Sequence, residues 1–284
     1  MATRVARAIP RRPRAGRARR AIRWLRSPRA RRLWRRVWTA PLALRLVVGL
    51  IVLVVVWSAV NWTYHVIRKP TELFFPVSGT LAKAPPDTWR QYAPLFRRHS
   101  TATISPELLA ALAQVEGSGD PVARTYWRWR VAWNPFDVYR PASSAVGMYQ
   151  ITDPTFREAR RYCVRDHVVI EDGCWFRSLY TRVLPSHAVE MTAALLDRDV
   201  ARTLERRRIV TATPRQKQDL AAVIHLCGTG PGDDFARRGF RLVPGQRCGD
   251  HDVAAYLARV NGMKRQFLRL AAAEPPDEPV WARR

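Results

Sequence analysis

The sequence predicts a mainly α-helical globular domain behind a single N-terminal transmembrane helix. Three observations lead to this prediction: an apolar run near the N-terminus, apolar residues at helical spacing through most of the following chain, and no alternating strand pattern of useful length. A chain of 284 residues has room for one well-filled globular domain and an extension, but hardly for two full domains.

The N-terminal extension, residues 1–45, is an arginine-rich tail. It holds 16 Arg and no Lys, Asp or Glu, whereas all 23 acidic residues come later. Subtracting these 16 charges from the formal net charge of +26 leaves +10 for the rest of the chain. Such a tail attracts anionic lipid headgroups, RNA or DNA alike through charge. Trp24, Trp34 and Trp38 fit a membrane-surface segment in contact with anionic lipid; a disordered topology signal is the alternative.

The apolar run over residues 46–60 predicts a transmembrane anchor over residues 46–64. A helix needs ~20 residues to cross the hydrocarbon core, and the rings of Trp57, Trp62 and Tyr64 fit an interfacial belt. No small-x-small cleavage site follows directly, which favours a retained anchor over a cleaved signal peptide. Because the arginines precede the run, we expect a single-pass protein of the inner (cytoplasmic) membrane, with a cytoplasmic N-terminus and a periplasmic or otherwise extracytoplasmic domain.

The four cysteines all follow the anchor: Cys163, Cys174, Cys227 and Cys248. Their spacing does not match the short Cys-x-x-Cys knuckles of zinc sites, which favours two disulfides in an oxidising compartment. Three pairings are open, and local pairing, Cys163–Cys174 with Cys227–Cys248, is the default expectation. Four buried free thiols are the alternative.

After the anchor we expect a proline-containing stalk at residues 65–86 and a short helix at residues 87–98. The helical domain is expected to cover residues 87–270, and a flexible C-terminal tail to follow at residues 271–284.

Four further helices are marked by caps and periodicity. One begins after Ser105, with a proline at its first position, and ends at Gly117. Another follows Thr213, which makes a capping box with Gln216. Apolar residues at helical spacing mark the other two, around residues 189–204 and 253–267.

Glu116 stands at the end of the first of these helices, four residues after Leu112 and seven after Leu109, and so shares their apolar face. Partial desolvation and the negative end of the helix dipole both disfavour the ionised carboxylate. A carboxyl group that stays protonated near neutrality suits a general acid acting on a glycosidic oxygen. The alternative is a structural glutamate with its head in water. Asp120 is the only second carboxyl group nearby in the sequence.

Three segments of the chain carry a family resemblance. Residues 104–118 read Ile-Ser-Pro-Glu-Leu-Leu-Ala-Ala-Leu-Ala-Gln-Val-Glu-Gly-Ser, residues 144–152 read Ser-Ala-Val-Gly-Met-Tyr-Gln-Ile-Thr, and residues 250–260 read Asp-His-Asp-Val-Ala-Ala-Tyr-Leu-Ala-Arg-Val. They resemble the Gln-Glu-Ser, Gly-Ala-x-Gly-Leu-Met-Gln-Ile and Tyr-Val-x-x-Val motifs of the soluble lytic transglycosylase family. In the first segment, Val and Gly are inserted around the family's spacing. The resemblance covers about residues 87 to 270.

This resemblance implies a lysozyme-like transglycosylase domain with Glu116 as its catalytic acid. The substrate-binding residues that it implies are Ser144, Tyr149, Gln150 and Tyr256. The chain departs from the family where those enzymes read Ala-Tyr-Asn-Ala-Gly-x-Gly, because residues 224–230 are Ile-His-Leu-Cys-Gly-Thr-Gly. That alignment places His225 at the tyrosine and a leucine at the asparagine, so the usual amide contact to substrate is missing. His225 is then either a substrate ligand or a packed histidine.

In the resembled enzymes the glutamate protonates the oxygen between N-acetylmuramic acid and N-acetylglucosamine, the N-acetyl group assists, and the muramyl C6 hydroxyl closes a 1,6-anhydro sugar. The resemblance therefore implies peptidoglycan glycan strands as the substrate and no metal or other cofactor. A lysozyme-type hydrolase and a non-catalytic wall-binding scaffold of the same fold are the alternatives. Protein partners do not follow from the sequence.

An aromatic segment at residues 126–139 contains six aromatic rings and two of the chain's arginines, with a third at position 140. Aromatic faces and guanidinium groups suit sugar rings and peptide-stem carboxylates. They equally suit a small satellite core under a long loop.

Overall fold

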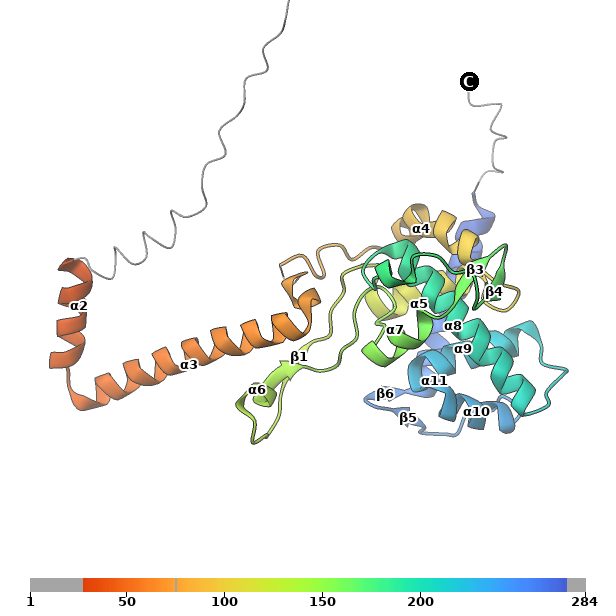
Figure 1. Cartoon of the computed structure of the whole chain (residues 1–284). Helices are drawn as coiled ribbons and strands as arrows, with labels where there is room; N and C mark the ends of the chain where they lie inside the picture. The colour runs from red at the N-terminus through yellow and green to blue at the C-terminus, as the bar shows by residue number, and fades with distance from the viewer. Residues whose placement is uncertain (1–27, 75, 275–284) are drawn as a thin grey trace, which may run out of the picture. The chain divides into compact units, whose positions relative to one another are not determined.

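The structure is a computed structural model that describes residues 28–74 and 76–274 of the chain (Figure 1). The described part is mostly helical, which confirms the predicted fold class. In chain order the elements are α2 (Pro28–Thr39), α3 (Leu42–Arg68), η1 (Pro70–Phe74), α4 (Pro85–His99), α5 (Pro106–Gly117), β1 (Trp127–Trp129), α6 (Pro135–Val138), β2 (Tyr139–Pro141), α7 (Asp153–Ala159), β3 (Cys163–Arg165), β4 (Val168–Ile170), η2 (Arg177–Leu179), α8 (Pro185–Arg206), α9 (Pro214–Cys227), α10 (Thr229–Arg237), β5 (Arg247–Cys248), β6 (His251–Asp252) and α11 (Val253–Ala272).

The first of two compact units, Met1–Tyr64, contains α2 and most of α3. The 27 residues of α3 correspond to about 40 Å of helix at the usual rise. An 18-residue window of α3 has a mean hydropathy of 2.6, and none of that window is buried. α3 is thus long and apolar enough to cross a membrane, and it contains the predicted anchor, residues 46–64. Residues 1–27 of the predicted tail, including Trp24, lie outside the described residues.

The second unit, His65–Arg284, is built around α5, which packs against α4, α8 and α11 (Figure 1). The Ser105 side chain caps α5 by accepting a hydrogen bond from the Leu108 backbone N–H, and residues 108–113 are all buried. Because α5 is enclosed by three other helices, its last turn is a rigid support for the side chains that it carries.

The other predicted helices form with small differences in length. Thr213 and Gln216 make the predicted capping box at the start of α9, each accepting from the backbone N–H of the other. α8 is longer than the expected residues 189–204 at both ends. α11 continues past residue 270, where the domain was expected to end. Residues 275–284 of the predicted C-terminal tail lie outside the described residues.

Three short antiparallel hairpins form that the sequence pattern did not indicate: β1 with β2, β3 with β4, and β5 with β6. Their strands have two or three residues, too short to produce a readable alternation of polar and apolar side chains. The predicted aromatic loop is the first of these hairpins, with α6 between its strands. Helices α7 and α10 were also not anticipated.

Both disulfides have the local pairing that was the default expectation. Cys163–Cys174 closes the β3–β4 hairpin with a Cα–Cα distance of 5.8 Å. Cys227–Cys248 ties the end of α9 to β5 with a Cα–Cα distance of 5.4 Å. Both distances lie in the usual range for disulfides.

Residues 65–86, expected as a stalk, belong to the second compact unit instead. The side chain of Glu72 is fully buried, lies 3.1 Å from Lys69 Nζ, and accepts hydrogen bonds from Arg124 and from the indole N–H of Trp127. The Gly79 backbone N–H donates to Asp120 Oδ2 at 2.7 Å. The segment is therefore fastened to the domain by buried polar contacts that its proline content did not reveal.

Candidate active site

Glu116 lies on the last turn of α5, where it meets side chains from α9 and α11. The hydroxyl of Tyr256 donates a hydrogen bond to Glu116 Oε1 at 2.5 Å. His225 Nε2 lies 3.8 Å from the same oxygen. The Glu116 side chain is 18% exposed and that of His225 is 12% exposed. Glu116, His225 and Tyr256, all predicted from the sequence, thus form one cluster that is mostly buried but still partly accessible to solvent.

Tyr256 is buried on α11, and its phenol is held in the neutral form. Burial is the main cause that raises its pKa well above the usual value, and the negative charge and hydrogen bond of Glu116 raise the pKa further. A phenol that keeps its proton remains a donor to Glu116 across the whole physiological pH range.

Gly117 explains how the end of α5 approaches the Gly147–Gln150 turn. A Cβ added at Gly117 would lie 2.8 Å from Met148 Cα and 3.0 Å from the Met148 carbonyl oxygen. The backbones therefore pack closer than any side chain at this position permits. This contact accounts for a glycine directly after Glu116, where the resembled enzymes have a serine.

The turn itself requires unusual backbone angles. Gly147 has a φ of 83°, and a Cβ there would lie 2.4 Å from the Arg182 carbonyl oxygen. Gln150 has a φ of 47°, and its side-chain amide donates to the carbonyl oxygens of Gly147 at 2.9 Å and Ala123 at 3.2 Å. Gln150 therefore stabilises the turn with the same amide that the resemblance assigns to substrate.

Two other predicted substrate contacts have structural roles. The Tyr149 side chain is fully buried in the core, and burial raises the pKa of its phenol well above the usual value. It presents no surface to a ligand, so the expectation of a direct sugar contact needs correction. The Ser144 hydroxyl is half-buried and accepts a hydrogen bond from the backbone N–H of Asp153, at the start of α7.

Asp120, the only second carboxyl group near Glu116 in the sequence, is also occupied by the backbone. It is buried, its Oδ1 accepts from the Val122 N–H at 2.8 Å, and its Oδ2 accepts from the Gly79 N–H at 2.7 Å. Asp120 shapes the loop after α5 and is not placed as a catalytic partner.

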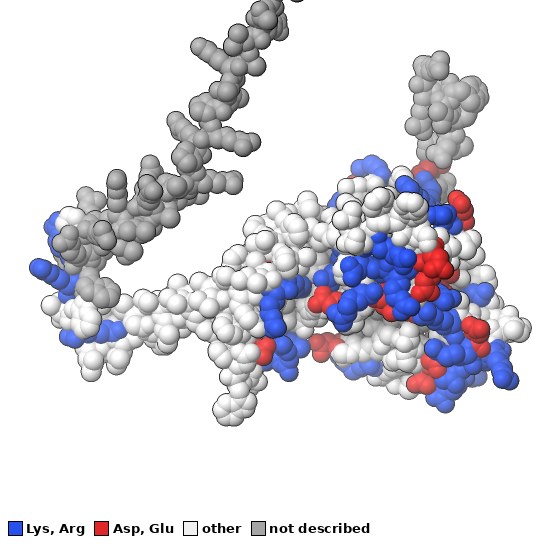
Figure 2. All heavy atoms as spheres, in the orientation of Figure 1, with Lys and Arg blue, Asp and Glu red and all other residues white. Residues whose placement is uncertain are grey.

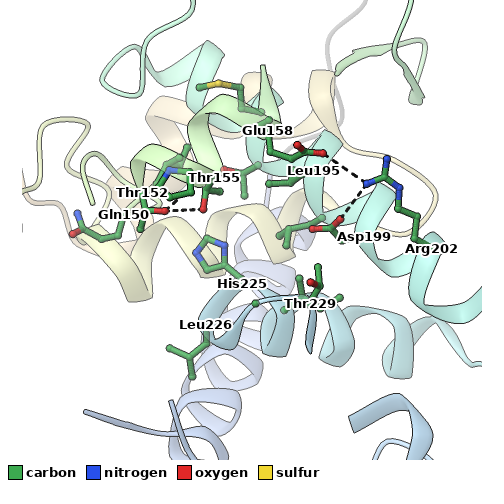
Figure 3. Close-up of a pocket in the computed structure, with 18 of the residues that line it drawn as sticks. Gln150, Thr152, Thr155, Glu158, Leu195, Asp199, Arg202, His225, Leu226 and Thr229 are labelled. Atoms are coloured by element: carbon green, nitrogen blue, oxygen red, sulfur yellow. Dashed lines mark hydrogen bonds and ion pairs between the residues drawn. The ribbon is translucent and has the colours of Figure 1, made fainter. Parts of the chain in front are cut away.

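His225 also lines a cavity of about 590 Å³, whose lining side chains are drawn in Figure 3. Gln150 and His225 line it; Glu116 is not part of the lining and meets the cavity through His225, 3.8 Å away. Its walls come from the segment after Gln150 and from α7, α8, α9 and the start of α10. The lining residues are Gln150, Ile151, Thr152, Pro154, Thr155, Glu158, Ala159, Met191, Thr192, Leu195, Leu196, Asp199, Arg202, Arg206, Ile224, His225, Leu226, Gly228 and Thr229.

One end of this cavity carries a charged group that sequence reasoning missed. Arg202 Nη1 lies 3.8 Å from Glu158 and 3.9 Å from Asp199 (Figure 3). Burial is the main cause that raises the pKa of Asp199 to about 6, while Arg202 acts in the opposite direction. Asp199 follows Leu195 and Leu196 at helical spacing, so a carboxylate on an apolar helix face was the available signal.

Residues 94–213 match the family model of the transglycosylase SLT domain. The match covers α5, the Gly147–Gln150 turn and α8, and therefore contains Glu116 and Gln150. It ends before α9 and α11, so His225 and Tyr256 lie beyond it. A comparison with curated proteins gave no match. This match supports the family expected from the sequence motifs over residues 94–213.

Proposed function

Because the chain carries a transglycosylase SLT domain, we propose that it is a membrane-anchored lytic transglycosylase that cleaves peptidoglycan glycan strands. The bond cleaved joins N-acetylmuramic acid to N-acetylglucosamine, and the product ends in 1,6-anhydro-N-acetylmuramic acid. The observation that carries this proposal is the position of Glu116, which is hydrogen-bonded to Tyr256 beside a cavity lined by Gln150 and His225.

In the proposed reaction Glu116 acts first as an acid and then as a base. Its carboxyl group gives a proton to the oxygen that leaves with N-acetylglucosamine, while the N-acetyl carbonyl oxygen of the muramyl residue bonds to the anomeric carbon. The Glu116 carboxylate then takes the proton of the muramyl C6 hydroxyl, whose oxygen displaces the N-acetyl oxygen. The proton returns to Glu116, and no water is consumed.

The contacts of Glu116 fit this cycle. Tyr256 donates to Oε1, and His225 approaches the same oxygen, so we assign the proton delivery to Oε2. The hydrogen bond from Tyr256 fixes the carboxyl plane and strengthens when Glu116 becomes a carboxylate. One carboxyl group is sufficient because the substrate supplies its own nucleophiles.

The anchor and the disulfides support an extracytoplasmic site of action. α3 is long and apolar enough to span a membrane, and the two disulfides suit an oxidising compartment. With the arginine-rich tail on the cytoplasmic side, the positive-inside rule places the domain across the inner membrane, where the peptidoglycan lies. The net charge of +10 outside the tail attracts an anionic wall polymer.

The test is mass analysis of peptidoglycan digested by the full chain in detergent. A lytic transglycosylase releases muropeptides lighter by one water than those of a hydrolase, because the C6 hydroxyl replaces water. Products with free reducing ends would instead establish a lysozyme-type hydrolase. No release of any muropeptide, by protein that still binds the glycan strands, would support the wall-binding scaffold.

A further inference from the structure

The hairpin of β1, α6 and β2 projects from the helical domain (Figure 1), and its tip, residues 129–134, is apolar except for Arg130 and Asn134. Val131 and Trp133 are fully exposed, and Trp129 is 68% exposed. Figure 2 shows the end of this projection as uncharged surface. Burying large apolar side chains is favourable, and a cluster of them on a protruding tip marks a contact with an apolar phase or partner.

Three arginines lie at or beside the tip: Arg130 within it, and Arg128 and Arg140 on the two strands. Arg128 and Arg140 face each other across the two strands, an arrangement of like charges that destabilises a hairpin. Asp137 pairs with Arg140 at 3.1 Å. Within the described part of the chain, no carboxylate forms an ion pair with Arg128 or Arg130. The expected partner of the tip is therefore both apolar and anionic.

The hairpin is joined to His65, which lies in α3 after the apolar run has ended. His65 Nε2 donates to the Phe136 carbonyl oxygen at 2.9 Å, and the His65 ring packs edge-on against Trp127 at 5.2 Å. α3 is helical through this residue, and His65 stands five residues after the apolar run ends. Five residues span at most about 18 Å of extended chain, so His65 stays close to the end of the apolar run whatever the orientation of the two units.

A buried ionic cluster fixes the base of the hairpin at this level. Glu72 has no exposed side-chain surface, and it binds Lys69, Arg124 and the Trp127 indole N–H. Lys69, four residues after His65, also donates to the carbonyl oxygens of Ser143 and Ala145 beyond β2. The chain that leaves α3 therefore holds the hairpin at both of its ends.

We propose that the hairpin tip inserts into the membrane leaflet that faces the domain. Val131 and Trp133 then lie at the boundary of headgroups and acyl chains, and Arg128 and Arg130 bind the phosphates of anionic phospholipids. This inference rests on the proposed membrane anchoring and adds a second membrane contact to it. Sugar binding by the tip is disfavoured, because sugar sites are concave and the tip is a projection outside the cavity lining.

Photo-cross-linking tests this proposal on the full chain in vesicles of phosphatidylethanolamine and phosphatidylglycerol. A benzophenone amino acid replaces Trp133, or Trp175 as the matched control, which is also exposed but lies in the loop after Cys174. The expected result is a lipid adduct at position 133 and none at position 175. Replacing both Arg128 and Arg130 with Gln should weaken the binding of the tip to the bilayer by about fivefold for each arginine, measured as a lower yield of the lipid adduct at position 133.

Equal lipid labelling at the two positions, or none at either, would overturn the inference. An adduct with added glycan strands in place of lipid would overturn it in favour of sugar binding. Release of the wild-type chain from the vesicles by alkaline carbonate would overturn both the anchor and the inference. Muropeptide release by the same variants reports on the proposed activity separately, because the tip lies outside the candidate active site.

Discussion

Replacing Glu116 with Gln is expected to separate folding from activity. Gln keeps the volume of the side chain, and its amide oxygen accepts the hydrogen bond that Tyr256 now donates at 2.5 Å. Because the volume and this hydrogen bond are both kept, the free energy of unfolding should change by no more than about 1 kcal/mol. An amide has no proton to give to the glycosidic oxygen, so turnover should fall by ~100-fold or more.

The assay pairs two measurements on the same preparations. Release of anhydro-muropeptides from purified peptidoglycan gives the turnover, and urea denaturation gives the free energy of unfolding. Glu107→Gln is the matched control, since Glu107 lies on the first turn of the same helix and outside the cluster. It should leave turnover unchanged. Wild-type turnover by Glu116→Gln would show that the catalytic assignment is wrong, and an unfolded variant would show that the carboxylate is structural.

Three other substitutions test the packing and charge arguments. Asp199→Asn should make the free energy of unfolding less dependent on pH. Because the pKa of Asp199 is raised in the fold, its protonated form stabilises the fold fully below pH 3.8, and this stabilisation is lost as the pH rises through about 6. At neutral pH this variant should be more stable by up to about 3 kcal/mol in urea denaturation, and an unchanged pH profile would contradict the assignment of Asp199. Gly117→Ala should destabilise the domain, because the contact with Met148 costs about 1–3 kcal/mol and outweighs a gain in helix propensity of roughly 1 kcal/mol; higher stability would refute the close packing. Glu72→Gln should cost about 3–5 kcal/mol by leaving Arg124 and Lys69 without their buried carboxylate, and thermal unfolding within error of wild type would disprove that role.

The sequence determined the features that depend on neighbours along the chain. The cap at Ser105, the capping box at Thr213 and the apolar spacing around Leu109 and Leu112 follow from the four-residue period of helical hydrogen bonds. The same local rules placed Glu116 at the end of a buried helix. They failed for the hairpins, whose strands are too short for a pattern, and for residues 65–86, whose prolines suggested a stalk.

Only the tertiary structure decided which side chains meet. Tyr256 lies 140 positions after Glu116, and no local pattern shows that its hydroxyl reaches Oε1 or that His225 approaches the same atom. The packing of the helices likewise buries Tyr149 in the core and places Asp199 in the lining of the cavity. These outcomes depend on how α5, α8, α9 and α11 pack, and helix packing is set by the shapes of whole faces. A sequence motif therefore names the residue types of a site, while the distances between them arise from the fold.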